Sequence, residues 1–199
     1  MHIDEEQEAL IDALAQNAGF DGWTQTSLRM ALAAMGHDPA EGRLAFPGGR
    51  GEMIKAYFGL GDERMIRLQR MQTDGLGLTA RVRAAVMARL SLMDGEKEAV
   101  RRAMAWLVLP GGAPCLAGII AHMADSIWFA AGDKSADMSW YSKRASLGGI
   151  LLATLFYWLS DTSMDSEKTR LFLDRRLAGV AKIGKFKARL PRLPRFQSA

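Results

Sequence analysis

Apolar residues recur every three or four positions along most of this chain, which is the spacing that places them on one face of an α-helix. The stretch from Asp4 to Ala18 shows this pattern, with Ala9, Leu10, Ala13 and Leu14 on one face and acidic residues in the first turn. No run of alternating β-branched and polar residues lies between turn signals, so strands are not expected. The pattern therefore predicts an all-α fold.

Caps and stop signals divide the chain into about nine predicted helices. The first is expected to end at Asn17-Ala18-Gly19, and the eighth to begin after one of the caps between Asp133 and Asp137. The other expected caps are Thr24 or Thr26, Thr79, Asp94, and one of Ser163, Asp165 and Ser166. The predicted helices cover approximately residues 4–18, 25–35, 39–44, 51–71, 79–93, 95–109, 114–131, 138–160 and 167–186.

Short connections throughout predict one domain over residues 1–184, followed by a basic tail at 185–199. Charge is distributed unevenly between the two ends of the chain. Residues 1–62 hold four basic residues against ten acidic ones, whereas residues 182–199 hold six basic residues and no acid. Such a tail either remains a solvated end or contacts anionic lipid headgroups.

Three short helices and a long one within residues 1–72 suggest a helix-turn-helix with a connecting helix, as in single-pocket repressors of the TetR type. Residues 79–184 would then form the ligand-binding and dimerisation part. Reading DNA requires positive charge at phosphates and hydrogen-bonding side chains at base edges. The candidate recognition helix, PAEGRLAF, offers only Arg43 for this purpose, within a segment of net charge −6. A packing role is favoured, and a TetR-type ligand-responsive repressor is the alternative function.

No combination of residues indicates catalysis or metal binding. His2, His37 and His122 are isolated along the sequence, and no Glu stands three residues before a His, as di-iron helices require. Asp125, one turn from His122, is expected to form a hydrogen-bonded pair with it. Cys115 lies among apolar residues, where a thiol is unreactive. We therefore expect no enzyme, no metal and no cofactor.

Two uncharged runs contain more apolar residues than the single apolar stripe of an amphipathic helix requires. Residues 145–160 are shorter than the roughly 20 residues that span hydrocarbon, and LPGGAP interrupts residues 103–124, so buried helices are favoured over membrane spans. Packing in a core or dimer and the lining of a lipid pocket remain equally open. The candidate lipid-binding residues are Leu107, Leu116, Ile119, Ile120, Met123, Ile127, Leu151, Leu155 and Phe156.

The stretch DMSWYSKR precedes the second of these predicted apolar helices. On a helix, Trp140, Tyr141 and Arg144 fall within a sector of about 100°. These three residue types are enriched at interface hot spots. They also suit a core Trp beside an Arg that extends its charge to solvent, and spacing alone slightly favours this second interpretation.

The same region resembles a known family. The closest likeness lies in the segment HMADSIWFAAGDKSADMSWYSKRASLGGILLATLFYWLSDTSMDSEKTRLFLDRRL, which resembles the ubiquinone-biosynthesis lipid-binding proteins, the Coq-nine family of mitochondria and their bacterial relatives. A weaker likeness in GFDGWTQTSLRMALAAMG and LAFPGGRGEMIKAYF extends it over roughly residues 5–180. The shared residues are Trp128, Ala131, Gly132, Asp133, Ser135, Asp137, Trp140, Tyr141, Arg144, Leu147, Gly149, Ile150, Asp161, Ser163, Phe172 and Leu173.

This resemblance implies a TetR-like fold that no longer binds DNA, a homodimer, and a hydrophobic pocket for an isoprenoid quinone intermediate or a phospholipid. It further implies association with a membrane and presentation of the lipid to the di-iron demethoxyubiquinone hydroxylase. The family's hydroxylase-facing patch corresponds here to Asp137, Trp140, Tyr141 and Arg144, with Asp125 and Ile127 as weaker candidates.

The tail departs from the family, because mitochondrial relatives continue into a long amphipathic helix whereas residues 185–199 read KFKARLPRLPRFQSA. Membrane contact is then expected from apolar residues alternating with cations. The start, MHIDEEQEAL, resembles neither a signal nor a transit peptide, so we expect a bacterial cytoplasmic protein on the inner membrane surface. The membrane candidates are Lys185, Phe186, Lys187, Arg189, Arg192, Arg195 and Phe196.

Deleting residues 185–199 is expected to lower binding to anionic liposomes, because the deletion removes five cations from a proposed membrane contact. The loss should be larger at low salt than at high salt, since salt screens exposed charges. Co-sedimentation of full-length and truncated protein with such liposomes measures it. Equal binding by the two proteins at low salt would contradict the prediction.

Overall fold

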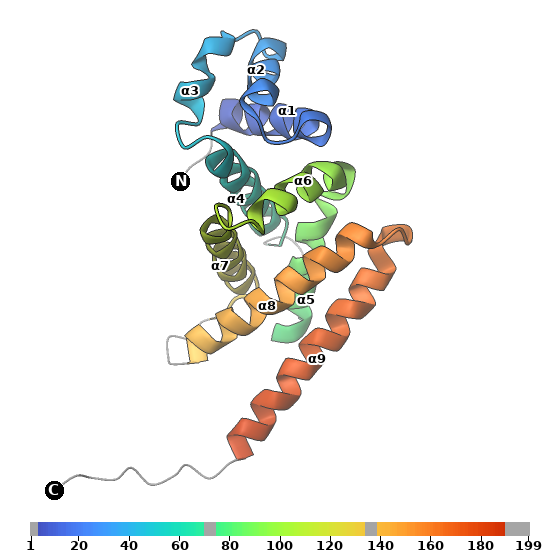
Figure 1. The fold of residues 1–199 in the computed structure, drawn as a ribbon. Helices are drawn as coiled ribbons and strands as arrows, with labels where there is room; N and C mark the ends of the chain where they lie inside the picture. Colours follow the sequence, from blue (N-terminus) through green and yellow to red (C-terminus); the bar gives the residue numbers. More distant parts are fainter. Residues whose placement is uncertain (1–3, 70–74, 134–138, 190–199) are drawn as a thin grey trace, which may run out of the picture.

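The computed structural model describes residues 4–69, 75–133 and 139–189, which are almost entirely helical and contain no strand (Figure 1). The all-α prediction is confirmed for this part of the chain. The α-helices are α1 (Glu5–Asp21), α2 (Gln25–Ala34), α3 (Gly42–Ala45), α4 (Arg50–Gln69), α5 (Leu78–Ser91), α6 (Lys97–Leu107), α7 (Ala113–Ala130), α8 (Ser139–Ser160) and α9 (Glu167–Arg189). Three short 3-10 helices are η1 (Pro39–Glu41), η2 (Asp94–Glu96) and η3 (Met164–Ser166).

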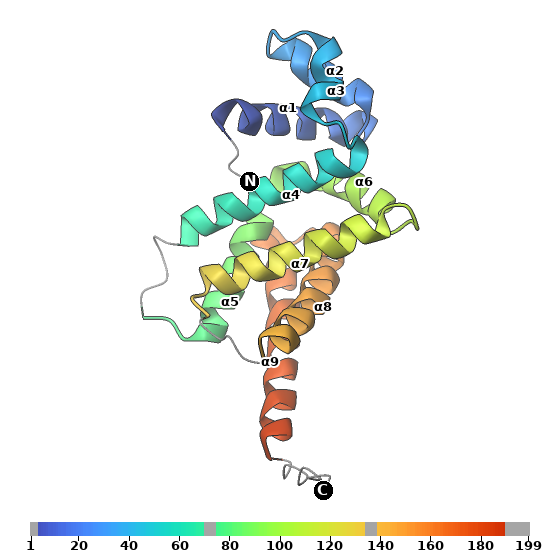
Figure 2. The ribbon, with the colours of Figure 1, turned by 90° about the vertical axis from the view of Figure 1, so that its left-hand side faces the viewer.

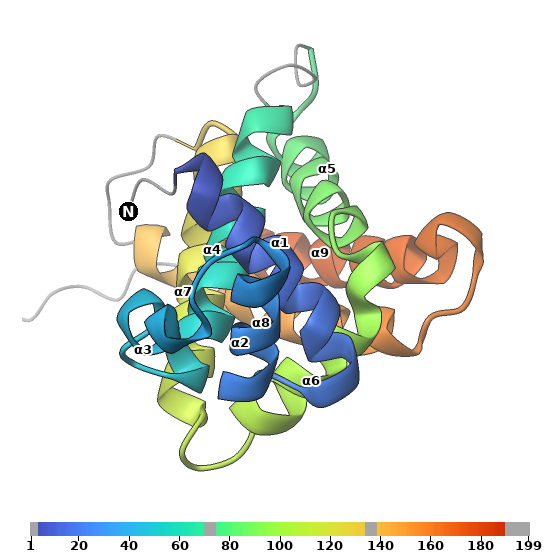
Figure 3. The same ribbon diagram turned by 90° about the horizontal axis from the view of Figure 1, so that it is seen from above.

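The helices form two connected groups. Helices α1, α2 and α3 lie together at one end, and α4 leads from them into the remaining helices (Figure 1). Seen from above, this N-terminal group covers one end of α4 (Figure 3). In the larger part, α7 lies between α4 and α8 (Figure 2), and α9 packs on α8 before extending away from the other helices.

Side-chain caps begin the first two helices of the N-terminal group. Asp4 accepts a hydrogen bond from the Gln7 amide at 2.8 Å, and Thr24 accepts one from the Ser27 amide at 3.1 Å, so Thr24 caps α2 as predicted. The predicted stop of α1 at residues 17–19 is wrong. The helix continues to Asp21, and Gly22, with a φ of 72°, ends it in a conformation that favours glycine.

Trp23 anchors this group to the larger part. Its indole Nε1 donates to the Ala99 carbonyl at 2.9 Å, its own carbonyl accepts from Arg50 Nε at 2.9 Å, and its buried ring lies 5.1 Å from that of Tyr57. A buried indole with its N–H satisfied combines a large apolar contact with a directional one.

Two predicted caps are wrong. Helix α5 begins at Leu78 after Gly77 with no side-chain cap, so Thr79 lies inside its first turn. Helix α6 begins at Lys97, and Asp94 lies in η2, where it accepts a hydrogen bond from the Trp158 indole of α8 at 3.0 Å. The Asp94 side chain therefore binds Trp158, which is distant in the sequence, instead of capping α6.

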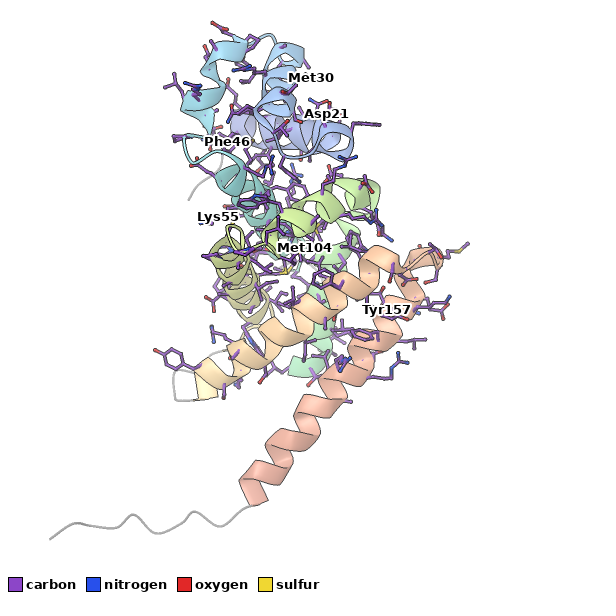
Figure 4. All side chains as sticks on the ribbon, viewed as in Figure 1. Asp21, Met30, Phe46, Lys55, Met104 and Tyr157 are labelled. Atoms are coloured by element: carbon purple, nitrogen blue, oxygen red, sulfur yellow. The ribbon has the colours of Figure 1, made fainter. Side chains whose placement is uncertain are left out.

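Asp161 organises the turn between α8 and α9. One of its carboxylate oxygens accepts from the Ser163 amide at 2.9 Å and hydroxyl at 2.6 Å, and the other accepts from the Thr169 amide at 2.8 Å and hydroxyl at 2.6 Å. Nearby, the Tyr157 ring of α8 stacks on Phe172 of α9 at 4.5 Å (Figure 4). Ser163, one of the three predicted caps, accepts from the Lys168 amide at 3.1 Å.

Helix α7 is long and apolar enough to cross a membrane by length and composition alone. In this fold it packs against α4, α5, α6 and α8, and two of its polar side chains, His122 and Asp125, pair with charged residues of α4 and α8. Only 33% of this helix is buried, so α7 packs between its neighbours and keeps one exposed face.

Helix α9 continues past the predicted domain boundary at residue 184 and ends at Arg189. Four membrane candidates, Lys185, Phe186, Lys187 and Arg189, therefore belong to its helical backbone. Arg192, Arg195 and Phe196 lie outside the described residues.

Replacing Asp161 by Asn is expected to destabilise the fold by about 2 kcal/mol at pH 7, because the α8–α9 turn loses charged hydrogen bonds. Burial acts in the opposite direction, but the hydrogen bonds from Ser163 and Thr169 hold the pKa of Asp161 well below its usual range. A carboxylate with a lowered pKa in the folded state stabilises the fold above its unfolded pKa of about 4, and this contribution is lost as the pH falls.

The difference in unfolding free energy between the wild type and Asp161→Asn should therefore be largest at pH 7 and shrink below about pH 4. Urea denaturation at pH 7 and pH 3 measures it. Asp165→Asn is the matched control, because Asp165 is exposed in the same turn at a φ of 51°, which Asn tolerates. An equal loss in both variants, or one independent of pH, would contradict this account of Asp161.

Candidate functional site

The α7–α8 groove runs between the two helices and has a volume of about 530 Å³. Leu116 and Ile120 line it from α7, and Leu152 lines it from α8. Gly149 widens it, since a Cβ on this residue would meet no atom within 4 Å. The groove is therefore an open apolar surface rather than a filled helix contact.

One ion pair lies at the edge of this groove. Arg144 Nε of α8 donates to the carboxylate of Asp125 on α7, and both residues line the groove. Tyr141, one turn earlier on α8, is 69% exposed. An exposed aromatic ring beside a paired arginine is a combination enriched in protein interfaces.

The structure places the predicted docking residues in different environments. Asp125 and Arg144 are brought together and Tyr141 lies on the surface, whereas the side chain of Trp140 and all of Asp137 lie outside the described residues. Ile127 is completely buried among the core residues, so its assignment to a partner-facing surface is corrected.

Most predicted lipid-binding residues belong to the core instead. Because α7 packs between α4 and α8, its buried apolar positions contact neighbouring helices rather than enclosing a cavity. The buried positions that line none of the described grooves are Leu107, Met123, Ile127, Leu151 and Leu155. Ile119 is also in the core but borders a groove toward α4, Leu116 and Ile120 line the α7–α8 groove, and Phe156 is exposed on α8.

The residues of the AGD segment hold the end of α7 to the start of α8. Lys143 donates to Asp133 at 3.0 Å, and its ammonium lies 5.6 Å from the centre of the Trp128 ring. Gly132 has a φ of 73°, and a Cβ there would lie 3.0 Å from an Arg81 nitrogen. This turn therefore needs glycine for both its conformation and its space.

A buried polar cluster on the other side of α7 was not expected from the sequence. Asp62 of α4, whose side chain is 2% exposed, accepts from Arg89 Nε of α5 at 2.7 Å with one oxygen. Its other oxygen lies 2.9 Å from His122 Nδ1 of α7. Arg89, 1% exposed, also donates to the Phe58 carbonyl at 2.9 Å. One carboxylate thus joins three helices.

His122 therefore has a different partner from the predicted one. Asp62 of α4 orients its ring, whereas Asp125, one turn away on α7, pairs with Arg144. The hydrogen bond with Asp62 raises the pKa of His122 above its ordinary value; burial opposes this effect, while the charges of Asp62 and Asp125 add to it.

A periodicity signal could have indicated Asp62. Phe58 and Met65 lie four residues before it and three after it, so Asp62 shares their apolar face. A charged residue on such a face requires a buried partner. The identity of that partner, Arg89, depends on tertiary packing that spacing along one helix does not encode.

The α4–α7 groove lies beside this cluster and has a volume of about 320 Å³. Phe58 and Ile119 form apolar walls, and His122, Lys55 and Glu63 provide its polar rim. Lys55 extends from α4 beside the start of α7 (Figure 4).

Among the described residues, no three His, Cys, Asp or Glu side chains gather where a metal ion could bind. Cys115 is buried, with its thiol 3.5 Å from the Gly51 carbonyl, and burial raises the pKa of this thiol. A thiol with a raised pKa is a weak nucleophile at neutral pH.

Comparison with known proteins finds a family match for the part of the chain that includes α7, the helix that lines both grooves. The COQ9 family model matches residues 114–184, which include most of α7, all of α8 and the greater part of α9. Residues 114–184 are thus similar to the COQ9 family.

Relatives that match between 52% and 89% of the chain carry the same name. The mitochondrial ubiquinone biosynthesis protein COQ9-B of Xenopus laevis is 29% identical over 186 residues, covering 89% of this chain and 63% of its own length. COQ9 of Xenopus tropicalis is 39% identical over 103 residues, which cover 52% of this chain and 32% of that protein. Human COQ9 is 27% identical over 186 residues, covering 89% and 58%. The chain thus spans less than two thirds of these mitochondrial proteins.

The fold has a solved counterpart in the TetR transcriptional regulator from Nitrosomonas europaea. It superposes with a TM-score of 0.70, covering 90% of this chain and 99% of the regulator at 22% sequence identity. The predicted TetR-like fold is confirmed, and identity at this level extends to the fold alone.

Proposed function

We propose that this COQ9-related chain is a non-catalytic lipid-binding accessory protein of ubiquinone biosynthesis. It holds the isoprenoid part of a quinone intermediate in the α7–α8 groove and presents the ring to the di-iron demethoxyubiquinone hydroxylase. The observation that carries this proposal is an open apolar groove between two helices that the COQ9 family model matches. The Asp125–Arg144 ion pair lies at its edge, and the exposed Tyr141 lies one turn away on α8.

The physical basis is the poor solubility of an isoprenoid chain. Each methylene removed from water contributes about 0.8 kcal/mol, so covering about ten carbons contributes roughly 8 kcal/mol before ordering costs. The volume of the α7–α8 groove, about 530 Å³, is within the range of small-molecule sites. Its apolar lining from Leu116, Ile120 and Leu152 suits a hydrocarbon chain.

The docking part of the proposal rests on Tyr141 and on the Asp125–Arg144 pair. Because this pair lies at the edge of the groove, a partner that contacts Tyr141 and Arg144 would meet the lipid's exposed end. Contact with a membrane surface and formation of a homodimer belong to the same proposal. The exposed apolar side chains of Phe156 on α8 and Leu171 on α9 support a dimer contact.

DNA recognition has no comparable support. The net charge of residues 1–62 is −6, and α3, which occupies the recognition-helix position, spans four residues with Arg43 as its basic side chain.

Filling the α7–α8 groove should remove the lipid while leaving the fold intact. Gly149→Leu projects a side chain into the groove from a position where a Cβ meets nothing, and Leu is a better helix former than Gly. The expected result is isoprenoid quinone or precursor in the solvent extract of the wild-type protein, purified from a ubiquinone-making host, and at least about a tenfold loss in the variant. Mass spectrometry of the extracts measures this.

Gly179→Leu is the matched control, since Gly179 on α9 also faces open space but lines none of the described grooves. Equal lipid content in Gly149→Leu and Gly179→Leu would place the lipid elsewhere. An extract containing only bulk phospholipid would reduce the chain to a membrane-associated adaptor.

Substitutions in the proposed docking surface, formed by Trp140, Tyr141 and Arg144, should weaken hydroxylase binding without unfolding the chain. Trp140→Ala, Tyr141→Ala and Arg144→Glu are each expected to raise the Kd for the purified hydroxylase about tenfold or more, as truncation of interface hot spots does. Biolayer interferometry measures binding, and thermal melting reports stability. Phe20→Ala, an equally exposed aromatic change on α1, should leave both unchanged.

A charge-swapped variant separates docking from internal packing. Arg144→Glu combined with Asp125→Arg restores an ion pair between α7 and α8 but reverses its direction. If Arg144 contacts the hydroxylase, binding stays weak in the double variant. Recovery of wild-type affinity would show that Arg144 acts only within the chain.

A further inference from the structure

We propose that the α4–α7 groove is a second binding site, separate from the lipid groove, for a monoanionic carboxylate carried on an apolar chain. His122 and Lys55 would bind the carboxylate, and Phe58 and Ile119 would contact the apolar part. This proposal does not depend on the ubiquinone function, because it concerns the opposite side of α7.

The first support is the orientation of His122. Its Nδ1 is held by Asp62, and Asp62 is itself fixed by Arg89 in the core, so the ring cannot turn without breaking its hydrogen bond with a buried carboxylate. Its side chain remains 65% exposed, and Nε2 has no hydrogen-bond partner within the described part of the chain. An exposed imidazole oriented by a buried carboxylate is pre-organised to bind a ligand through its outer nitrogen.

The second support is the charge balance around the groove. Lys55 is exposed and makes no ion pair with any described residue, and protonated His122 adds a second positive charge. Glu63 on the same rim adds one negative charge, while Asp62 and Arg89 neutralise each other behind the groove. Asp125, on the same helix as His122, is paired with Arg144. The remaining single positive charge compensates a monoanion, whereas a phosphate dianion would keep one uncompensated charge that is costly to desolvate.

The third support comes from two glycines. Gly59 of α4 and Gly118 of α7 both line the groove, and a Cβ on either would meet no atom within 4 Å. Glycine inside a helix is less favourable than alanine by about 0.5–1 kcal/mol. No neighbouring side chain fills the space over either glycine, so a ligand can lie against both helix backbones in this groove.

Isothermal titration of the full chain with sodium decanoate at pH 6 tests the proposal. Saturable binding is expected, with decanol and decyltrimethylammonium at least about tenfold weaker because neither carries an anion. Decyl phosphate, largely dianionic at pH 7, should also bind more weakly there. His122→Gln should weaken decanoate binding about tenfold or more, and Gly118→Leu should abolish it.

The pH dependence provides a separate measurement. Because Asp62 raises the pKa of His122, the protonated ring persists above its ordinary pH range. Decanoate binding should therefore weaken as the pH rises through that pKa in the wild type, and remain constant in His122→Gln. Gly149→Leu, which fills the other groove, should bind decanoate as the wild type does.

Several results would overturn the proposal. Equal binding of decanol and decanoate would show an apolar surface without carboxylate recognition, and tighter binding of decyl phosphate would contradict the monoanion assignment. Unchanged decanoate binding in both His122→Gln and Gly118→Leu would place the ligand elsewhere. If Gly118→Leu does not fold, Gly59→Ala provides the steric test, since its added Cβ also enters open space.

Discussion

The contact between Asp62 and Arg89 constrains the larger part of this fold. Both side chains are fully buried, and removing one would leave the other charge uncompensated, which typically destabilises a protein by about 3–5 kcal/mol. Gly61 allows the contact, because a Cβ there would lie 2.4 Å from the Arg89 guanidinium carbon. Since the same carboxylate also holds His122, α4, α5 and α7 have one mutual arrangement. Both grooves depend on it, because α7 forms a wall of each.

Helix α7 also explains how one chain can carry two distinct surfaces. Ile119 and Ile120 are adjacent in the chain but line different grooves, since successive helix positions differ by about 100°. The groove toward α8 has the Asp125–Arg144 pair at its edge, and the groove toward α4 has His122 on its rim. Different residues of the same helix therefore serve each surface.

Periodicity was sufficient to predict the helices but not their environments. A repeat of three to four residues identifies a helix and one apolar face, as it did for α1, whose end was nevertheless misplaced because Gly19 is tolerated inside it. For α7, apolar on several faces, the repeat could not separate Met123 in the core from Ile120 on a groove. Asp94 shows the same limit for polar residues. Its spacing fits a helix cap, but the Trp158 indole, distant in the sequence, binds it. Partners of this kind depend on how helices meet, which no single helix specifies.

The attachment of the N-terminal helices through Trp23 has a consequence for the order of folding. The indole of Trp23 and its acceptor, the Ala99 carbonyl, are 76 residues apart. During synthesis, α1, α2 and α3 leave the ribosome long before α6 exists to receive that indole. Contacts with large sequence separation form late because a long loop must close first. The N-terminal group, although made first, would therefore reach its final packing only after more than half of the chain has been synthesised. Until then, the apolar surface around Trp23 is available to chaperones.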